Sequence, residues 1–376
     1  MNEFRIRLME KLKHHLESEE CRYTDNSYVY FMRRMEEALE RDAYWLAHAR
    51  IPSLRGFTRM YKDRLEFQIE NKSPLYEMLR DEYSRETLVT VAAYSLLGHR
   101  LIKFPYYTPD TIPRTDRLHE RALRENPDSA MARQVADNWF RLSNRLYYYD
   151  ASCCGLNATM YSTPQFLYGM VYDNDYRYDE GGVVIDVEPG DYVMDGGGCF
   201  GDTALFFAHK AGPGGKIFSF EPNPFLYLLF AYNIGLNPEF RDRMILADTA
   251  MSDAPGEDCP MDIAGWGSRL HTAKDSESDG LHLVKTTTID EEARKHRLER
   301  LDFIKMDIEG SELAALKGAA ESITRFKPKL AICVYHKPED YIVIPEFINA
   351  LGLGYRFYLK HHFMNGWETV LYARVE

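Results

Sequence analysis

The sequence predicts an α/β protein in which a helical region precedes a seven-stranded, mostly parallel sheet. From about residue 180 onward, short runs rich in β-branched and aromatic residues alternate with helical segments, which is the pattern of βαβ units. Only residues 361–368 separate the last two runs, so these strands should pair as an antiparallel hairpin, because a parallel crossover needs a dozen or more residues. Before about residue 103, apolar residues recur at helical spacing instead.

The helical region is predicted for residues 1–150. A further helix within it should begin at the N-cap Ser84 and end at Gly98. Prolines break the pattern over residues 104–113, which predicts a linker, and another helical stretch should cover about 116–147. We expect this region to act as a substrate cap or an oligomerisation element of a homo-oligomer. The apolar residues that show the helical spacing are Leu8, Leu12 and Leu16, and then Met32, Met35 and Leu39.

The sheet is predicted for the second domain, residues 151–376. Its strands are short and are separated by helical segments, except for the closing hairpin. The seven expected strands cover residues 192–195, 216–220, 243–248, 303–307, 330–335, 355–360 and 369–374.

Composition and charge exclude several classes of protein. With 45% hydrophobic and 28% charged residues, the 376-residue chain can build a core and should be globular. Its net charge of −12 would on balance repel a nucleic acid backbone. No apolar run reaches the roughly 18 to 20 residues of a membrane helix, and the N-terminus lacks a secretory signal, so we expect a cytoplasmic protein. The six cysteines form no C-x-x-C pair, which argues against a zinc site and a disulfide framework.

A glycine-rich loop follows the first strand of the sheet. Gly196, Gly198 and Gly201 satisfy G-x-G-x-x-G before a helical run, where glycines let the backbone turn tightly and let a ligand approach the helix N-terminus. The second strand ends at Glu221, about 20 residues farther on, where a carboxylate can accept hydrogen bonds from both ribose hydroxyls. Together these features predict an adenosine-containing cofactor on a Rossmann-like sheet. NAD and S-adenosylmethionine both fit this geometry.

Asp195 favours S-adenosylmethionine. A carboxylate directly before the first glycine would face a dinucleotide pyrophosphate unfavourably, but it suits the cationic aminoacyl end of S-adenosylmethionine. At the end of the third strand, a side chain or backbone amide should hydrogen-bond to the edge of the adenine ring. The candidate cofactor-binding residues are Asp195, Gly196, Gly197, Gly198, Gly201, Asp202, Thr203, Glu221, Pro222, Asn223, Asp248, Thr249, Ala250 and Asp307.

The end of the fourth strand carries the most specific motif. Residues 302–312 read Asp-Phe-Ile-Lys-Met-Asp-Ile-Glu-Gly-Ser-Glu, and Leu-Lys-Gly-Ala follows at 316–319. With Asp-Gly-Gly-Gly at 195–198, Phe-Glu-Pro-Asn-Pro at 220–224 and Thr-Thr-Thr-Ile-Asp at 286–290, the order resembles that of FkbM-type S-adenosylmethionine-dependent methyltransferases over residues 180–376. The resemblance implies a class I methyltransferase fold, S-adenosylmethionine as cofactor, and O-methylation of sugars or secondary metabolites. Many family members carry Ala-Asn where this chain has Gly198-Cys199.

Methyl transfer to a hydroxyl needs in-line positioning and a proton acceptor. Asp307 and Glu309 follow the fourth strand and His336 follows the fifth, so all three should lie at the edge where open α/β sheets bind ligands. We predict these three as the catalytic residues, and the sequence does not decide which one accepts the proton. A divalent metal held by the same three residues is an alternative that the sequence does not favour, because these ligands are too few to specify one.

Two other functions fit parts of the pattern. A nicotinamide-dependent oxidoreductase would also use the glycine loop and Glu221. A non-catalytic interaction protein could keep a methyltransferase-like sheet as a scaffold. The methyltransferase prediction explains the most motifs, with a hydroxylated small molecule or glycan as the acceptor.

Overall fold

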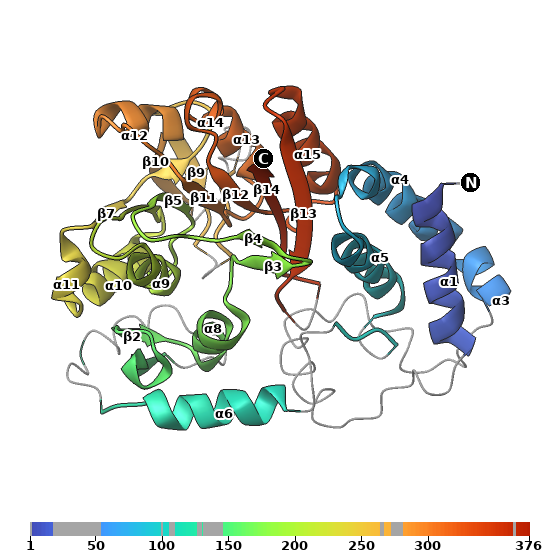
Figure 1. Ribbon diagram of the computed structural model, residues 1–376, viewed down its shortest axis with the longest axis horizontal. Coiled ribbons are helices and arrows are strands. Elements are labelled where there is room, and N and C mark those ends of the chain that lie inside the picture. The colour runs from blue at the N-terminus through green and yellow to red at the C-terminus, as the bar shows by residue number, and fades with distance from the viewer. Residues whose placement is uncertain are drawn as a thin grey trace.

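The computed structural model describes residues 2–17, 54–98, 101–104, 110–125, 130, 146–263, 267–271, 281–363 and 366–376. A central sheet is covered by helices on both faces, and the N-terminal helices lie along one of its edges (Figure 1). Among the described helices, none is both long enough and apolar enough to cross a membrane.

The central sheet has seven strands in the order β13-β14-β12-β11-β5-β6-β7. All neighbours are parallel except β14, which is antiparallel to both β12 and β13. This arrangement confirms the predicted class I methyltransferase fold and its closing hairpin. The strands are β5 (Tyr192–Gly196), β6 (Lys216–Phe220), β7 (Met244–Ala247), β11 (Phe303–Met306), β12 (Lys329–Cys333), β13 (Tyr355–His361) and β14 (Thr369–Val375), so all seven predicted strands are present, with ends shifted by at most two residues.

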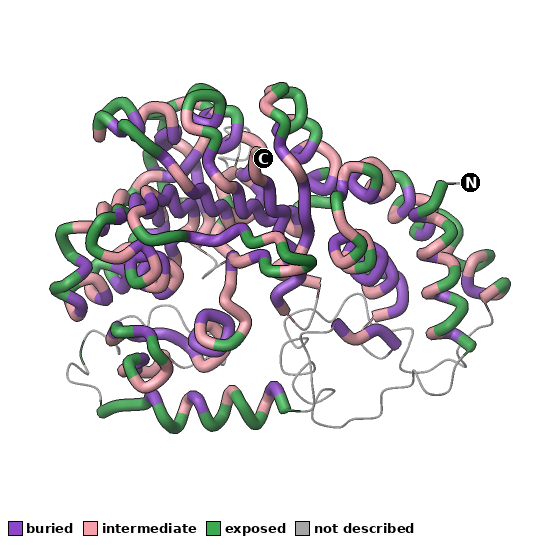
Figure 2. Tube along the Cα trace, viewed as in Figure 1, coloured by how far each residue is buried: buried purple, intermediate pink, exposed green. Residues whose placement is uncertain are grey.

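Alternate residues of each central strand enter different cores, and Figure 2 shows the central strands as the most buried part of the chain. In β11, Ile304 packs in the core on one face and Phe303 in the core on the other. Covering the first face are α12 (Ile289–Lys295), α13 (Glu312–Lys317), α14 (Ala320–Phe326) and α15 (Asp340–Ala350). Covering the second are α9 (Asp202–Ala211), α10 (Pro224–Gly235) and α11 (Pro238–Arg241).

The N-terminal helices extend the first core past β13. They are α1 (Glu3–Glu17), α3 (Leu54–Met60), α4 (Lys62–Met78) and α5 (Glu82–Leu97). Helix α5 packs on β13, so an edge strand that would otherwise be open is covered. The predicted α1 stripe of Leu8, Leu12 and Leu16 is buried as expected. Met32, Met35 and Leu39 lie outside the described residues.

Two predicted boundaries in this region are wrong. Asp81, not Ser84, caps α5, and the Asp81 carboxylate accepts a hydrogen bond from the Ser84 amide. Ser84 lies inside the helix, where its hydroxyl accepts from the Leu359 amide of β13. Pro113 does not break a helix, because it lies in the first turn of α6 (Thr111–Ala122), where its missing N–H removes no helical hydrogen bond. Of the helix predicted over 116–147, α6 covers residues 116–122 and ends at Ala122, and residues 126–129 and 131–145 lie outside the described residues.

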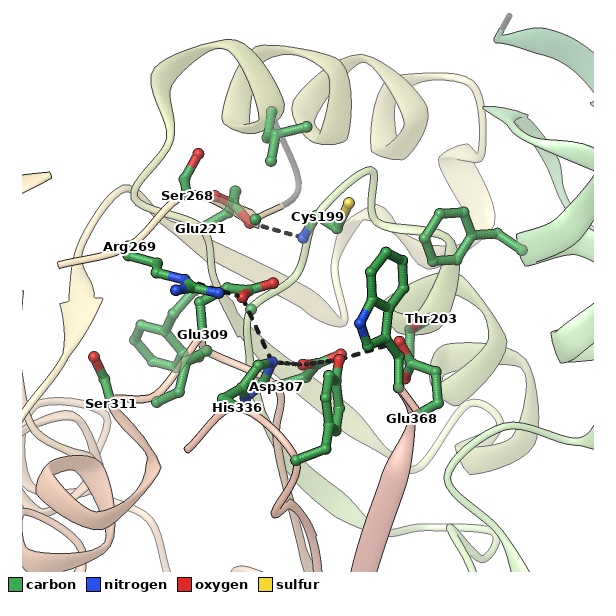
Figure 3. A pocket seen from close by; sticks show the side chains of 18 of the residues that line it. Cys199, Thr203, Glu221, Ser268, Arg269, Asp307, Glu309, Ser311, His336 and Glu368 are labelled. Carbon is green, nitrogen blue, oxygen red and sulfur yellow. Dashed lines mark hydrogen bonds and ion pairs between the residues drawn. The ribbon is translucent and has the colours of Figure 1, made fainter. Parts of the chain in front are cut away.

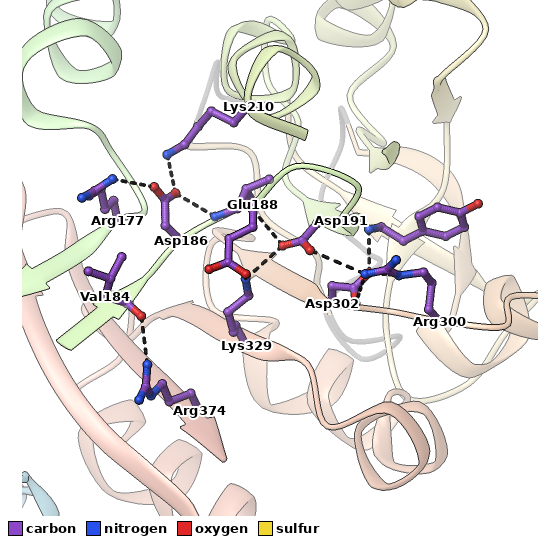
Figure 4. Close-up of polar contacts among 12 residues, drawn as sticks. Arg177, Val184, Asp186, Glu188, Asp191, Lys210, Arg300, Asp302, Lys329 and Arg374 are labelled. Atoms are coloured by element: carbon purple, nitrogen blue, oxygen red, sulfur yellow. Dashed lines mark hydrogen bonds and ion pairs between the residues drawn. The ribbon is translucent and has the colours of Figure 1, made fainter. Parts of the chain in front are cut away.

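Between α6 and the sheet, the chain forms small elements that the sequence did not predict. They are β1 (Tyr147–Asp150), η1 (Ala151–Cys154), β2 (Thr159–Ser162), α8 (Pro164–Tyr168), η2 (Gly169–Asp173), β3 (Tyr178–Glu180) and β4 (Val183–Ile185). Buried ion pairs tie this segment to the domain: Asp186 contacts both Arg177 and Lys210, and Asp191 bonds Lys329 at 3.0 Å (Figure 4). Strands β1 and β2 form one two-stranded sheet, and β3 and β4 form another. A three-stranded sheet of β8 (Ala250–Met251), β10 (His282–Thr287) and β9 (Asp258–Met261) follows β7.

Candidate active site

A cavity of about 450 Å³ opens at the carboxyl ends of the parallel strands (Figure 3). This is the edge at which open α/β sheets bind ligands. Of the predicted site residues, Gly197, Thr203, Glu221, Pro222, Ala250, Asp307, Glu309 and His336 line it. Asp195, Gly196, Gly198, Gly201, Asp202, Asn223, Asp248 and Thr249 are not among its lining residues.

Glu221 lies at the end of β6 with its carboxylate fixed by backbone donors. Its Oε2 accepts from the Cys199 amide at 2.8 Å, and its Oε1 accepts from the Asn223 amide at 2.9 Å. Each oxygen therefore keeps a lone pair for another donor. Burial raises the pKa of Glu221 to about 7, although the two amides favour the ionised form. The sequence prediction of a carboxylate ready to accept two hydroxyls agrees with this geometry.

The glycine loop is shaped by packing as much as by ligand access. A Cβ at Gly198 or Gly201 would collide with the ring of Phe230 from α10, and a Cβ at Gly197 would collide with the Asp307 carbonyl. Gly197 also has a φ of +77°, which favours glycine. Gly198 and Gly201 are therefore needed for the packing of α10, and the approach of a ligand to this loop stays a prediction.

The carboxylates of Asp195 and Asp202 are buried and contact other side chains of the protein. The Asp195 carboxylate is fully buried, lies 3.2 Å from Lys305 Nζ, and accepts from Ser219 Oγ at 2.9 Å. Asp202 accepts from Ser162 Oγ at 3.0 Å. The prediction that Asp195 faces the aminoacyl end of the cofactor conflicts with this placement. Its carboxylate instead neutralises Lys305, a residue of the 302–312 motif to which the sequence analysis gave no role.

His336 lies among three carboxylates at the ends of β11 and β12. Its Nε2 is 3.3 Å from Asp307 Oδ1 and 3.6 Å from Glu309 Oε2, and its Nδ1 is 2.8 Å from Glu312 Oε1. Neither ring nitrogen makes a well-aligned hydrogen bond, so these contacts are close ion pairs. The structure brings together the three predicted catalytic residues and adds Glu312.

His336, Asp307 and Glu309 have strongly shifted pKa values. Burial opposes protonation of His336, but the contacts with Asp307 and Glu312 outweigh it and raise the pKa of His336 to about 11. Burial would raise the pKa of Asp307, but His336 and Lys305 hold it well below the usual range. Burial, aided by the Asp307 charge, raises the pKa of Glu309 to about 7. With no other ligand at Nε2, His336 is therefore a cation at neutral pH.

Residues 195–357 match the family model of the methyltransferase FkbM domain. Residues 195–357 form an FkbM methyltransferase domain. The match includes the glycine loop, Glu221 and the cluster around His336, so the family expected from the motifs is confirmed for this segment. No curated protein matches the chain by sequence.

Solved structures of methyltransferases resemble the chain at low identity. Methyltransferase FkbM from Methylobacillus flagellatus KT is 20% identical, with 83% of this chain and 60% of that chain covered and a TM-score of 0.48. The present chain thus spans about 60% of that protein's length. An O-methyltransferase from Bacillus cereus is 12% identical over 70% of this chain and 97% of its own, with a TM-score of 0.35. Aeropyrum pernix fibrillarin, solved with natively bound S-adenosyl-L-methionine, is 14% identical over 61% of this chain and 93% of its own, with a TM-score of 0.32.

The cavity also contains residues that sequence reasoning missed. Tyr176 donates to Asp307 Oδ2 at 2.8 Å, and Tyr335 donates to Asp307 Oδ1 at 3.3 Å and to Glu368 Oε1 at 3.1 Å. Tyr335 precedes His336 in the chain and could have been found there. Tyr176 and Glu368 come from segments without a motif, so only the fold reveals them.

The cavity carries an excess of acidic groups. Its described lining includes five carboxylates, whereas its cations and ionisable rings are Arg269, His336 and His362. Burial raises the pKa of Glu368 to about 8 and that of Asp175 well above its usual range, and Arg269 and His336 are cations, so the number of carboxylates does not make the cavity strongly anionic. The five carboxylates are Asp175, Glu221, Asp307, Glu309 and Glu368.

Proposed function

We propose that the FkbM domain transfers a methyl group from S-adenosylmethionine to a hydroxyl oxygen of a small molecule or glycan. The observation that carries the proposal is the placement of Glu221 and the Asp307–His336 cluster on one cavity. Glu221 offers lone pairs to a ribose, and the cluster offers polar groups to a hydroxyl acceptor. S-adenosylmethionine supplies a methyl group activated by a positively charged sulfur.

The cavity residues fit this cofactor. Both Glu221 oxygens already hold backbone donors, so the carboxylate is fixed in the orientation that accepts two hydroxyls. Met251, Met261 and Leu270 give the same cavity an apolar wall where a purine could pack. The match of residues 195–357 to the methyltransferase FkbM domain supports the methyltransferase over the nicotinamide-dependent alternative.

The acceptor end of the cavity combines aromatic and polar side chains. Phe166 and Trp367 contribute rings, and Glu368 contributes a carboxylate held by Tyr335. When the acceptor oxygen attacks the methyl carbon, the bond from carbon to sulfur breaks and its electron pair stays on sulfur, while the hydroxyl proton must leave. We propose that Asp307, Glu309 and His336 orient this hydroxyl and that Glu309, whose pKa burial raises to about 7, accepts its proton, because His336 is already protonated when Nε2 has no ligand.

A labelled-methyl assay tests the reaction. The full chain is incubated with S-adenosylmethionine carrying an isotopic methyl label and with a panel of hydroxylated sugars and polyketides. We expect label on an oxygen of at least one acceptor, located by mass spectrometry and NMR. Label found only on nitrogen or carbon would contradict O-methylation, and tight cofactor binding without any transfer would favour the non-catalytic scaffold.

A further inference from the structure

The surroundings of His336 are unusual for a histidine that only stabilises the fold. The ring is 3% exposed, yet neither nitrogen has a well-aligned hydrogen bond. Glu312 is fully buried and its Oε2 has no partner among the described residues. Buried polar atoms without partners are costly and point to a group that would satisfy them.

We propose that Asp307, Glu309 and His336 bind a divalent cation, with Mn²⁺ the best match, and that Glu312 orients the histidine. The proposal rests on the proposed function only for the catalytic role of the ion, because binding can be measured without any methyl transfer.

The two ring nitrogens of His336 have different roles in the proposed site. Nδ1 lies 2.8 Å from Glu312 Oε1, so in the proposed site the ring keeps its proton on that side and an ion replaces the proton on Nε2. Nε2 then presents its lone pair toward Asp307 at 3.3 Å and Glu309 at 3.6 Å, on the side that faces the cavity. A ligand histidine whose other nitrogen donates to a carboxylate is the usual arrangement at protein metal sites.

Asp307 has the support that a ligand carboxylate needs. Tyr176 and Tyr335 donate to its two oxygens, at 2.8 and 3.3 Å, and leave lone pairs on both. Its liganding oxygen, that of Glu312 and a His336 nitrogen all lie within 4.8 Å of one another. Asp307 follows β11 and His336 follows its parallel neighbour β12, so the sheet sets the positions of these two ligands, while Glu312 begins α13.

Glu309 completes the set from the cavity side. Its φ of +54° is a left-handed conformation that is strained for non-glycine residues, and such strain is concentrated at functional sites. Its side chain is 19% exposed, so it can close on an ion by rotating. Two carboxylates and one imidazole form a mixed oxygen and nitrogen set, which suits Mn²⁺ better than the all-oxygen preference of Ca²⁺.

The ion would bind next to the acceptor end of the cavity. A hydroxyl bound to a divalent cation loses its proton to water more readily, as metal-bound water does. Asp307, Glu309 and His336 would then act through the ion, and no side chain would need to take the proton directly.

Titration of the chelator-treated full-length protein with Mn²⁺ tests the proposal. The titration is done without S-adenosylmethionine, and electron paramagnetic resonance measures the concentration of the free ion. We expect one ion per chain with micromolar affinity, at least tenfold weaker binding in Asp307→Asn and His336→Gln, and about 10- to 100-fold weaker binding in Glu312→Gln. His296→Gln is the matched control, since this histidine also lies beside a carboxylate, Glu292, but away from the cavity, and should bind Mn²⁺ as the wild type does. Glu309→Gln changes a partly exposed ligand and should also bind Mn²⁺ at least tenfold more weakly than the wild type. This variant keeps the test possible if a variant at a buried position does not fold.

Absence of Mn²⁺ binding by the wild type at millimolar concentration would overturn the proposal. Binding that survives in His336→Gln but disappears in Asp173→Asn would also overturn it, because the ion would then belong to the cluster of Asp173, Asp175 and His362. Calorimetry with S-adenosylmethionine on the same chelator-treated protein tests the proposed function separately.

Discussion

Replacing Glu221 by glutamine tests the cofactor site with the least change in shape. The carboxylate of Glu221 accepts amide protons from Cys199 and Asn223 and has one lone pair left on each oxygen. The glutamine amide nitrogen cannot accept, so one ribose hydroxyl loses its partner, and the other hydrogen bond loses its charge. A hydrogen bond to a charged group contributes about 1.5 to 3 kcal/mol, so affinity for S-adenosylmethionine should fall by about 10- to 150-fold.

Isothermal titration calorimetry measures this change, with circular dichroism to confirm the fold. Glu239→Gln is the matched control, since Glu239 is exposed on α11 and should bind the cofactor as the wild type does. If folded Glu221→Gln bound S-adenosylmethionine with unchanged affinity, the ribose would be held elsewhere, and the reasoning from the two lone pairs would be refuted.

Three further outcomes follow from the same structure. Because burial raises the pKa of Glu221 to about 7, the empty site must lose a proton before it accepts two hydroxyls at lower pH. The Kd of S-adenosylmethionine should therefore rise by up to about tenfold per pH unit as the pH falls below 7, and calorimetry should show a flat profile for Glu221→Gln. Gly198→Val should destabilise the fold by about 1 to 3 kcal/mol in urea unfolding, because its side chain would overlap Phe230, and unchanged stability would show that the loop can move. Lys305→Met leaves Asp195 buried without its cation and should cost about 3 to 5 kcal/mol. Adding Asp195→Asn should recover part of that loss, and no recovery would mean that the pair is not coupled.

The sheet could be predicted because its strands and crossovers have simple sequence patterns. Each of the seven strands is a short β-rich run, and the interval between β13 and β14 is too short for a parallel connection. The small sheets could not be predicted, because β1, β3 and β8 are two to four residues long and have no periodicity of their own. The N-cap of α5 was predicted wrongly because Asp81 and Ser84 are both good capping residues. The sequence alone does not show that the Ser84 hydroxyl bonds to β13 instead.

The candidate site likewise contains residues that the sequence could locate and residues that it could not. Glu221 and His336 could be located because a residue at a strand's carboxyl end reaches the ligand edge whatever packs around it. Asp195 could not, because its orientation depends on Lys305 in the neighbouring strand. Glu368 lies far along the chain and reaches the cavity only when the closing hairpin is in place.

Parallel calorimetric titrations of the wild-type chain with S-adenosylmethionine and with NAD test the central claim most directly. The fixed carboxylate of Glu221 would accept a ribose from either ligand, but the match of residues 195–357 to the methyltransferase FkbM domain favours S-adenosylmethionine. We therefore predict one molecule of S-adenosylmethionine bound per chain and no measurable binding of NAD. Binding of NAD without binding of S-adenosylmethionine would contradict the claim and identify a nicotinamide-dependent enzyme on this sheet.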